Sequence, residues 1–425
     1  MSHSIAELHD LFLKSNGVCT DTRSLEKGQI FFALKGPNFN GNGYAEKALK
    51  EGASLAVIDE EAYEAGSQYF LVKDALEALQ DLARYHRDTF DIPFFGMTGS
   101  NGKTTTKELA ARVLATQYAV HYTKGNFNNH IGVPLTVLST PAETDIALIE
   151  MGANHLGDIA LLCDIAKPTH GLITNIGNAH LGEFGGYENL IRAKSELFDY
   201  LRKTDGKAFI NMEDKVLSNM SKRFPEAIQY PNEFCQLASS DPYVNYLDEN
   251  GQEHASQLIG EYNFSNIAAA VSMGKYFEIE DPYEAIDRYL PENNRSEVID
   301  IKSNKIVLDA YNANPASMEA ALQNLIQMKG DTKVILLGEM KELGEYSDDE
   351  HRKIVRLAQE LGLSQSFWVG EGFEKVISEK EKCFANVDEL SDHLEQNPLQ
   401  GATVLIKGSR STQMEKLTLN KKIWT

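Results

Sequence analysis

The chain of 425 residues is long enough for about three domains of ordinary size, which excludes a single small module. Hydrophobic residues make up 42% of it and charged residues 24%, a balance that excludes a disordered or collagen-like chain. The 62 acidic residues outnumber the 41 Lys and Arg residues and give a net charge of −21. Most of the surface would therefore repel nucleic acid and anionic membranes, and we expect no nucleic-acid partner.

The four cysteines are scattered, with no C-x-x-C pair and no histidine cluster at zinc spacing, so we expect reduced thiols and no zinc site. The first ten residues do not combine a basic segment with an apolar one, and no apolar run is long enough to span a bilayer. These features predict a cytoplasmic protein without membrane insertion.

Helical and extended patterns alternate through residues 1–90, which predicts a small α/β domain. Helices are expected over 5–15, 44–51 and 75–88, and strands over 29–34, 54–58 and 69–72. The segment Asp91-Ile92-Pro93 marks the boundary, because the residue before a proline disfavours helix and an apolar strand follows at once.

Residues 91–292 repeat strand and helix in a way that predicts a doubly wound, mostly parallel sheet. Strands are expected over 93–97, 146–150, 171–176 and 207–211, and helices over 104–116, 187–201, 263–276 and 281–290. A polar stretch around Asn250-Gly251 interrupts the alternation and is typical of a hairpin turn.

Residues 293–425 start a second alternation, which predicts a Rossmann-like α/β domain. Strands are expected over 305–309, 333–337, 367–369 and 403–406, and helices over 316–328, 348–361 and the C-terminal segment.

The most informative segment is residues 94–106, in which an apolar strand leads into glycines, then Lys103-Thr104, then a helix. Glycines let backbone N–H groups turn toward a phosphate, and the helix start adds partial positive charge. Lys103 would contact the β- and γ-phosphates, and the Thr104 hydroxyl would bind Mg²⁺. The spacing differs from G-x-x-x-x-G-K-[ST] by one residue, because Met97 stands where that pattern has its first glycine. A helix-capping turn with a solvated lysine is the alternative.

Two further side chains follow strands of the sheet that carries this loop. Glu150 ends one predicted strand, and His180 lies just beyond the next. Because the carboxyl ends of parallel strands face the ligand crevice, both are candidate metal ligands, the alternative being solvated side chains. Lys194 lies in the helical segment 192–198, where the composition alone favours a surface lysine.

Taken together, these segments resemble the Mur ligase family. The matching stretches are Gly99–Thr104, Glu150–Gly152, Asn175–Leu181 and Ala193–Leu197, in the family's order and approximate separation. The stretches Lys124–Pro134, Asp309–Met318 and Leu337–Gly344 are similar to the branch that adds D-alanyl-D-alanine.

The resemblance implies an N-terminal UDP-sugar domain over 1–90, a central ATP-binding domain over 91–292 and a C-terminal Rossmann-like domain over 293–425. It implies an ATP-dependent ligase that joins D-alanyl-D-alanine to UDP-N-acetylmuramoyl-tripeptide through an acyl phosphate. We expect small-molecule substrates and a monomer. Lysine and meso-diaminopimelate both remain open as the third residue of the tripeptide.

The resemblance also implies roles for individual residues. Catalytic roles fall to Lys103, Lys194 and His180. One Mg²⁺ would be held by Thr104 and Glu150, and a second by His180 and N6-carboxylated Lys194. ATP would be bound by Gly99, Ser100, Asn101, Gly102, Lys103, Thr104, Thr105, Asn263, Asn266, Arg295, Asp309 and Asn312. The substrates would be bound by Asp21, Thr22, Arg23, Asn126, Asn129, Lys407 and Arg410.

Two segments depart from the family pattern. The adenine-side segment has Tyr262 where Gly-x-His-Asn-x-x-Asn places histidine, and Asn38–Tyr44 lacks the usual Asp-Gly-His. The alternatives are folylpolyglutamate synthase, a sister Mur ligase that adds a single amino acid, and a nucleotide-switched binding protein without ligase activity.

Overall fold

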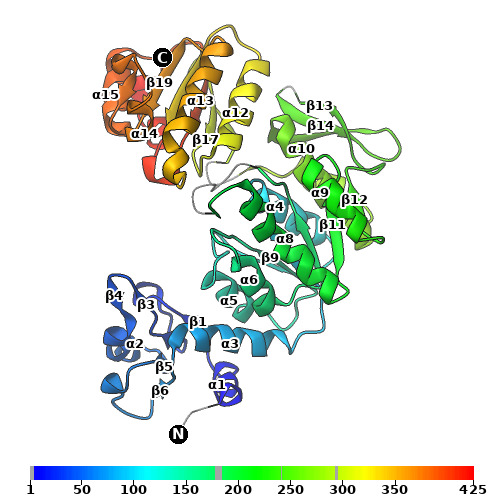
Figure 1. Ribbon diagram of the computed structural model, residues 1–425, viewed down its shortest axis with the longest axis vertical. Coiled ribbons are helices and arrows are strands. Elements are labelled where there is room, and N and C mark those ends of the chain that lie inside the picture. The colour runs from blue at the N-terminus through cyan, green and yellow to red at the C-terminus, as the bar shows by residue number, and fades with distance from the viewer. Residues whose placement is uncertain (1–3, 178–183, 241, 292–294) are drawn as a thin grey trace.

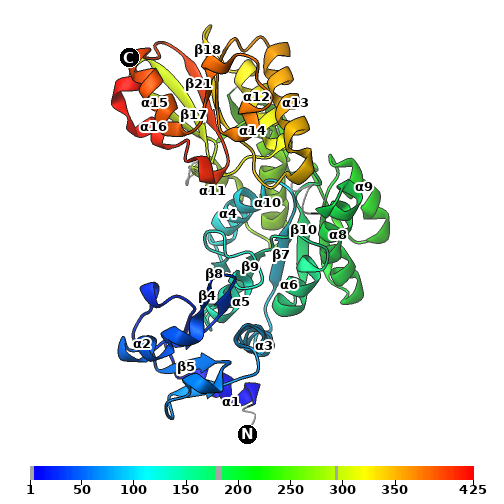
Figure 2. The same cartoon turned by 60° about the vertical axis from the view of Figure 1, so that its left-hand side comes forward.

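The computed structural model describes residues 4–177, 184–240, 242–291 and 295–425. Figures 1 and 2 show an elongated molecule, with the N-terminal segment at one end, the C-terminal segment at the other and the remaining chain between them. Among the helices of these ranges, none combines the length and the apolar composition that a bilayer crossing needs.

A four-stranded parallel sheet forms the N-terminal part, in the order β1-β2-β5-β6. Its strands are β1 (Val18–Cys19), β2 (Ile30–Phe32), β5 (Leu55–Ile58) and β6 (Tyr69–Leu71), and a separate antiparallel pair joins β3 (Lys35–Gly36) to β4 (Phe39–Asn40). Helices α1 (Ile5–Phe12) and α3 (Ala75–Arg87) cover one face, and α2 (Ala45–Lys50) covers the other. All residues of β2 and β5 are buried because both faces of the sheet are covered.

The central part is a six-stranded parallel sheet in the order β12-β11-β10-β7-β9-β8. Its strands are β7 (Phe94–Thr98), β8 (Val120–Tyr122), β9 (Ile146–Glu150), β10 (His170–Ile173), β11 (Lys207–Asn211) and β12 (Ile228–Tyr230). One face is covered by α5 (Gly132–Leu138), α6 (Asp158–Ala166) and α8 (Tyr187–Lys203), and the other by α4 (Lys103–Leu114) and α10 (Phe264–Tyr276). Helices on both faces of a parallel sheet confirm the doubly wound prediction.

The strand order of this sheet reverses at β7, because β8 and β9 lie on one side of it and β10 to β12 on the other. In open α/β sheets, ligands bind beyond the carboxyl ends of the strands at such a reversal. The loops after β7 and β10 meet there, where the Ser100 N–H donates to the Asn175 carbonyl oxygen over 3.0 Å. The topology therefore favours this edge of the sheet as the ligand site.

The short helix α9 (Lys215–Met220) lies between β11 and β12, and a small antiparallel sheet follows the central strands. Its strands are β13 (Gln236–Ser239), β14 (Tyr243–Leu247) and β15 (Glu253–Ile259). The predicted turn at Asn250-Gly251 lies between β14 and β15, which confirms the hairpin.

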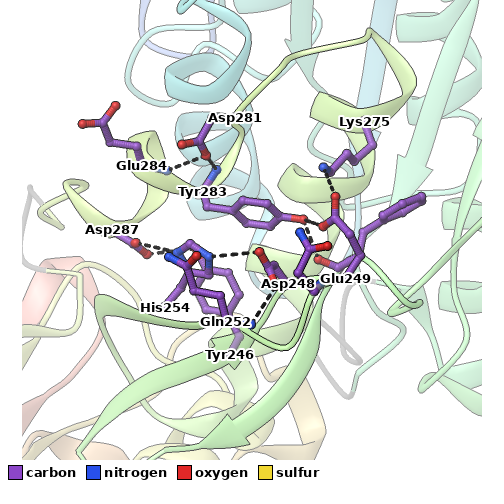
Figure 3. A network of polar contacts seen from close by, with 12 residues as sticks. Tyr246, Asp248, Glu249, Gln252, His254, Lys275, Asp281, Tyr283, Glu284 and Asp287 are labelled. Atoms are coloured by element: carbon purple, nitrogen blue, oxygen red, sulfur yellow. Dashed lines mark hydrogen bonds and ion pairs between the residues drawn. The ribbon is translucent and has the colours of Figure 1, made fainter.

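Figure 3 shows how polar and aromatic side chains attach this small sheet to α10 and to α11 (Tyr283–Asp287). The His254 Nδ1 atom lies 3.0 Å from a carboxylate oxygen of Asp287, and the His254 ring stacks on Tyr283 with centroids 4.6 Å apart. Lys275 on α10 forms an ion pair with Glu249 at 2.6 Å. These contacts fix the hairpin to the central part of the molecule.

The C-terminal part is a six-stranded sheet in the order β16-β17-β21-β18-β19-β20, parallel except for the edge strand β16. Its strands are β16 (Glu297–Ile301), β17 (Asn304–Asp309), β18 (Lys333–Gly338), β19 (Gln365–Val369), β20 (Cys383–Phe384) and β21 (Thr403–Lys407). One face packs against α12 (Pro315–Gln327), α13 (Ser347–Glu360) and α14 (Glu371–Glu374), and the other against α15 (Val387–Gln396) and α16 (Lys416–Leu419). This arrangement confirms the Rossmann-like prediction.

Candidate active site

A cavity of about 970 Å³ lies between the central and C-terminal sheets, at the edge where the central strand order reverses. Its volume is at the upper end of the range typical of small-molecule sites. Of the residues predicted from the sequence, those that line it are Ser100, Asn101, Gly102, Lys103, Thr104, Thr105, Asn126, Asn129, Glu150, Lys194, Asn263, Asn266, Arg295, Asp309, Asn312 and Lys407. Residues more than 300 positions apart in the sequence thus share one cavity.

The loop between β7 and α4 has the backbone that a phosphate site requires. Gly99 has a φ of +144° and Gly102 a φ of +78°, which glycine adopts without strain. Gly102 is the N-cap of α4, so the first N–H groups of that helix face the cavity end of the loop. The Lys103 ammonium donates to the Gly99 carbonyl over 2.7 Å and to the Ser100 carbonyl over 3.2 Å. Burial and the nearby Arg295 guanidinium lower the pKa of Lys103, although Glu150 opposes this effect.

The Glu150 carboxylate, which the sequence predicted as a metal ligand, is buried at the end of β9. The Thr104 hydroxyl donates to its Oε1 atom over 3.2 Å, and the Asn128 side-chain amide donates to the same oxygen over 2.9 Å. The other oxygen, Oε2, lies 3.4 Å from the Nζ atom of Lys107. The structure therefore brings the predicted pair Thr104 and Glu150 together and adds two contacts that the sequence analysis missed.

The oxygen atoms at this wall of the cavity are suitable ligands for Mg²⁺. A hydroxyl and a carboxylate oxygen at 3.2 Å from each other are hard oxygen ligands beside the loop that would hold the phosphates. Within the described ranges, no group of three or more His, Cys, Asp or Glu side chains is arranged to hold a metal. Mg²⁺ commonly takes its remaining ligands from phosphate and water. His180, the ligand predicted for a second Mg²⁺, lies outside the described residues.

Lys194 on α8 also lines the cavity but is itself almost fully buried, at 2% exposure. Its Nζ atom lies 3.4 Å from the Ala153 carbonyl oxygen and 5.4 Å from the centroid of the Phe184 ring. Burial, together with repulsion from Lys103, lowers the pKa of this lysine to about 7. Near neutral pH, Lys194 would therefore be an uncharged amine in a substantial fraction of the molecules.

The predicted adenine-side asparagines form a buried chain of hydrogen bonds next to α4. The Thr106 hydroxyl donates to the Asn266 Oδ1 atom over 3.0 Å, and the Asn266 amide donates to the Asn263 Oδ1 atom over 2.9 Å. Asn263 in turn donates to the Ile259 carbonyl over 2.8 Å. Tyr262, which replaces the family's histidine, lines the cavity beside them.

The C-terminal part contributes charged groups to the opposite wall. The Arg295 guanidinium lies 3.5 Å above the centroid of the Tyr311 ring. The Lys407 ammonium donates to the Asp309 carboxylate over 2.5 Å and to the Asn312 carbonyl over 3.0 Å.

A hydrogen bond joins the loop between β7 and α4 directly to the C-terminal part. The Asn314 side-chain amide donates to the Asn101 Oδ1 atom over 2.7 Å. Asn314 is also the N-cap of α12, so its side chain is fixed by the start of that helix.

Four predicted substrate residues lie away from this cavity. Asp21, Thr22 and Arg23 belong to the N-terminal part, where the Arg23 guanidinium forms an ion pair with Asp21 at 2.6 Å. Arg410 pairs with Glu415 at 2.8 Å and is mostly exposed. Gly99 is the one predicted nucleotide residue of the described ranges that does not line the cavity. The cavity therefore brings the other predicted nucleotide residues together with three predicted substrate residues, Asn126, Asn129 and Lys407.

Comparison with known proteins identifies the family. The family model of the Mur ligase family catalytic domain matches residues 14–87, that of the Mur ligase middle domain residues 97–274, and that of the Mur ligase glutamate ligase domain residues 294–410. The UDP-N-acetylmuramoyl-tripeptide–D-alanyl-D-alanine ligase of Bacillus subtilis is 34% identical over 95% of this chain and 92% of its own. The chain belongs to the Mur ligase family.

Solved structures of Mur ligases extend the likeness to the arrangement of the whole chain. MurF from Acinetobacter baumannii superposes with a TM-score of 0.85 at 29% identity and covers 97% of each chain. The MurF ligase of Thermotoga maritima, solved in complex with ADP, gives a TM-score of 0.85 at 25% identity over 97% of this chain and 98% of its own. The family resemblance inferred from short motifs is thus confirmed across the N-terminal, central and C-terminal parts of the chain.

The geometry of the loop predicts the effect of adding a single methyl group. The Cβ atom of Gly102→Ala would lie 2.3 Å from the Asn266 Oδ1 atom, so the loop or Asn266 must move. We expect this variant to bind MgADP at least about tenfold more weakly, the equivalent of one hydrogen bond to a charged group, as measured by titration calorimetry.

Gly251→Ala is a matched control, because Gly251 has the same φ of +78° but no atom within 4 Å of the added Cβ. It carries the same backbone strain, about 1 kcal/mol, at a distant hairpin turn and should bind MgADP like the parent chain. Equal MgADP affinity in Gly102→Ala and the parent would show that this loop does not hold the nucleotide.

Proposed function

We propose that this chain is an ATP-dependent ligase that joins D-alanyl-D-alanine to UDP-N-acetylmuramoyl-tripeptide, in the synthesis of peptidoglycan precursors. The observation that carries the proposal is the cavity itself, in which a phosphate loop, oxygen ligands for Mg²⁺ and several cations converge. The full-length likeness to the Bacillus subtilis enzyme of that name supports the same reaction and substrates.

The chemistry explains why such a reaction needs a phosphate loop. A carboxylate does not acylate an amine in water, because its negative charge makes it unreactive and oxide is a poor leaving group. When a carboxylate oxygen of the tripeptide attacks the γ-phosphorus of ATP, ADP leaves and an acyl phosphate forms. The amine of D-alanyl-D-alanine then attacks the carbonyl carbon, and phosphate leaves as the amide bond forms.

The protein's own groups hold the reactants together against charge repulsion. Backbone N–H groups of residues 100–104 and the Lys103 ammonium would bind the β- and γ-phosphates. Arg295, which faces the loop from the C-terminal part, would neutralise further phosphate charge, and Asn263 and Asn266 would lie on the adenine side. Asp309 and Asn312 would contact the ribose side of the nucleotide.

Thr104 and Glu150 would hold one Mg²⁺, and we assign His180 and Lys194 to a second. When bound, these ions would neutralise charge on the phosphates and the tripeptide carboxylate. As an ammonium, Lys194 would repel a metal. As an N6-carboxylated side chain it would supply carboxylate oxygens, and its lowered pKa supports this modification because CO₂ reacts with the uncharged amine.

The remaining predicted residues define the substrate side of the proposal. We assign Asp21, Thr22 and Arg23 to the uridine diphosphate, Asn126 and Asn129 to the tripeptide, and Lys407 and Arg410 to the acceptor carboxylate. These residues come from three domains, which we draw at 1–90, 91–292 and 293–425. In Figure 1 the N-terminal part lies at the end of the molecule opposite the C-terminal part, and we propose that the domains move relative to one another when the substrates bind.

We further propose that the enzyme acts as a monomer in the cytoplasm. ATP and UDP-linked precursors are both cytoplasmic metabolites, and one chain carries every group assigned above. Its substrates are small molecules, and its net charge of −21 argues against a nucleic-acid partner.

The function is tested by following phosphate release from ATP with the UDP-linked tripeptide, in its lysine and its diaminopimelate form, with and without D-alanyl-D-alanine. Phosphate release that depends on both the tripeptide and the dipeptide, with formation of the UDP-linked pentapeptide, is expected. Release that needs a single amino acid in place of the dipeptide would replace the proposal with a sister Mur ligase. Release that needs a folate in place of the tripeptide, with glutamate as the amine, would replace it with a folylpolyglutamate synthase. Release without any acceptor would point to a nucleotide-switched protein.

The role of Lys194 is tested separately. Lys194→Ala should lose at least about a hundredfold in turnover, the typical cost of removing one group that stabilises charge in the transition state. High bicarbonate should not restore activity, because no amine remains to be carboxylated. The parent chain incubated with ¹³C-bicarbonate should give a carbamate resonance by NMR that Lys194→Ala lacks.

Lys203→Ala, an exposed lysine at the end of the same helix, serves as the control and should keep both turnover and the resonance. Full turnover in Lys194→Ala, or an unchanged carbamate resonance, would refute the assignment of Lys194.

A further inference from the structure

One buried cation beside the cavity has no part in the mechanism proposed above. The side chain of Lys107, one helical turn after Lys103 on α4, is only 1% exposed. Its Nζ atom lies 3.4 Å from the Glu150 Oε2 atom and 5.9 Å from the centroid of the Tyr122 ring. Burying a lysine costs several kcal/mol unless it is paired, so its carboxylate partner is the main reason it is tolerated.

The contacts of Glu150 divide the carboxylate into two sides. Its Oε1 atom accepts hydrogen bonds from Thr104 and Asn128, which both line the cavity together with Glu150. Its Oε2 atom faces Lys107, which is not among the residues that line the cavity. Lys107 therefore holds the carboxylate from the interior and leaves the Oε1 side toward the site assigned to Mg²⁺.

This arrangement has an electrostatic consequence. The Glu150 carboxylate and the Lys107 ammonium together carry no net charge, and Lys103 and Arg295 add positive charge around the same cavity. Without bound nucleotide, a divalent cation that approaches Glu150 would gain little electrostatic attraction from this neutral ion pair. Once a nucleotide brings its phosphates into the loop, the balance of charge reverses and favours the cation.

We propose that Lys107 is a positioning residue that fixes the Glu150 carboxylate and makes divalent-metal binding there conditional on bound nucleotide. The inference rests on the proposed function, because it takes Thr104 and Glu150 as metal ligands and the cavity as the nucleotide site. Metal and nucleotide then bind as a unit, since each raises the affinity of the other by the same factor. Such coupling would keep a bare metal ion from occupying the loop before ATP arrives.

A purely structural role for Lys107 makes a different prediction. If the ion pair only stabilised the fold, its loss would lower stability but would leave metal affinity in the folded protein unchanged. If Lys107 sets the charge at Glu150, its removal leaves a buried, uncompensated carboxylate that a metal ion can neutralise. Metal affinity without nucleotide therefore separates the two roles.

The experiment measures Mn²⁺ binding to the full-length chain by electron paramagnetic resonance, with and without ADP. The parent chain should bind Mn²⁺ weakly alone and more tightly with ADP. Lys107→Met, which keeps an unbranched side chain but removes the charge, should bind Mn²⁺ alone at least about tenfold more tightly, as expected for one charge within 4–6 Å. The enhancement by ADP should shrink by the same factor.

Three further variants make the result specific. Lys275→Met removes a lysine from an ion pair on α10, so it changes the net charge equally and should bind Mn²⁺ like the parent chain. Lys107→Arg keeps the charge and should keep weak binding in the absence of ADP. Adding Glu150→Gln to Lys107→Met should remove the gained affinity. If Lys107→Met does not fold, Lys107→Gln replaces it, with the same expectation.

Two results would count against this role of Lys107. The proposal is overturned if Lys107→Met and the parent chain bind Mn²⁺ equally well without ADP, or if the gain survives Glu150→Gln. The proposed function fails in a distinguishable way, because the parent chain itself would then show no binding of ADP and no effect of ADP on Mn²⁺.

Discussion

The proposed ligand site depends on positive charge that is concentrated at one edge of the central sheet, in a chain that is otherwise strongly acidic. A net charge of −21 opposes any triphosphate, so binding must come from local groups that act at short range. The loop before α4 supplies backbone N–H groups and a helix N-terminus, and Lys103 on α4 and Arg295, just before β16, approach the same cavity from two separate segments. Because the site is partly buried, these charges are screened less than they would be on the surface.

The same concentration of charge explains the unusual state of individual groups. Lys194 is buried close to Lys103, which lowers its pKa to about 7 and prepares an amine that carries little charge. Lys107 forms an ion pair with the Glu150 Oε2 atom and does not line the cavity. The buried lysines of this site thus differ in their partners. Lys107 and Lys407 each face a carboxylate, at 3.4 Å and 2.5 Å, whereas the Nζ atom of Lys194 lies 3.4 Å from a backbone carbonyl oxygen.

Much of the fold follows from the sequence, because strong periodicity and loop chemistry agree. The strands at 146–150 and 207–211 lie where they were expected, and the loop at Gly99–Thr104 joins a strand to a helix as its composition predicts. Helix α6 was not predicted, because apolar residues surround most of its short length and leave no clear amphipathic period. Helix α15 was not predicted, although its pattern is amphipathic.

Sequence motifs predict only some of the residues that make up the site. The contact between Thr104 and Glu150 could be predicted because β7 and β9 are neighbouring parallel strands, whose carboxyl ends share an edge of the sheet. Their role as metal ligands stays a prediction. Asn128 and Lys107 were not predicted, because their contacts with Glu150 form only when α4 and the segment before α5 pack around β9. The spacing of Lys103 and Lys107, one helical turn apart on the same face of a helix, was the one available signal for Lys107.

The most direct test of this account is a crystal structure of the full-length chain with a non-hydrolysable ATP analogue and Mg²⁺. The account predicts that the β- and γ-phosphates contact the N–H groups of residues 100–104 and that a metal ion contacts both Thr104 and Glu150. The account would be contradicted if the triphosphate bound elsewhere and left the loop empty, or if the metal ion made no contact with Glu150.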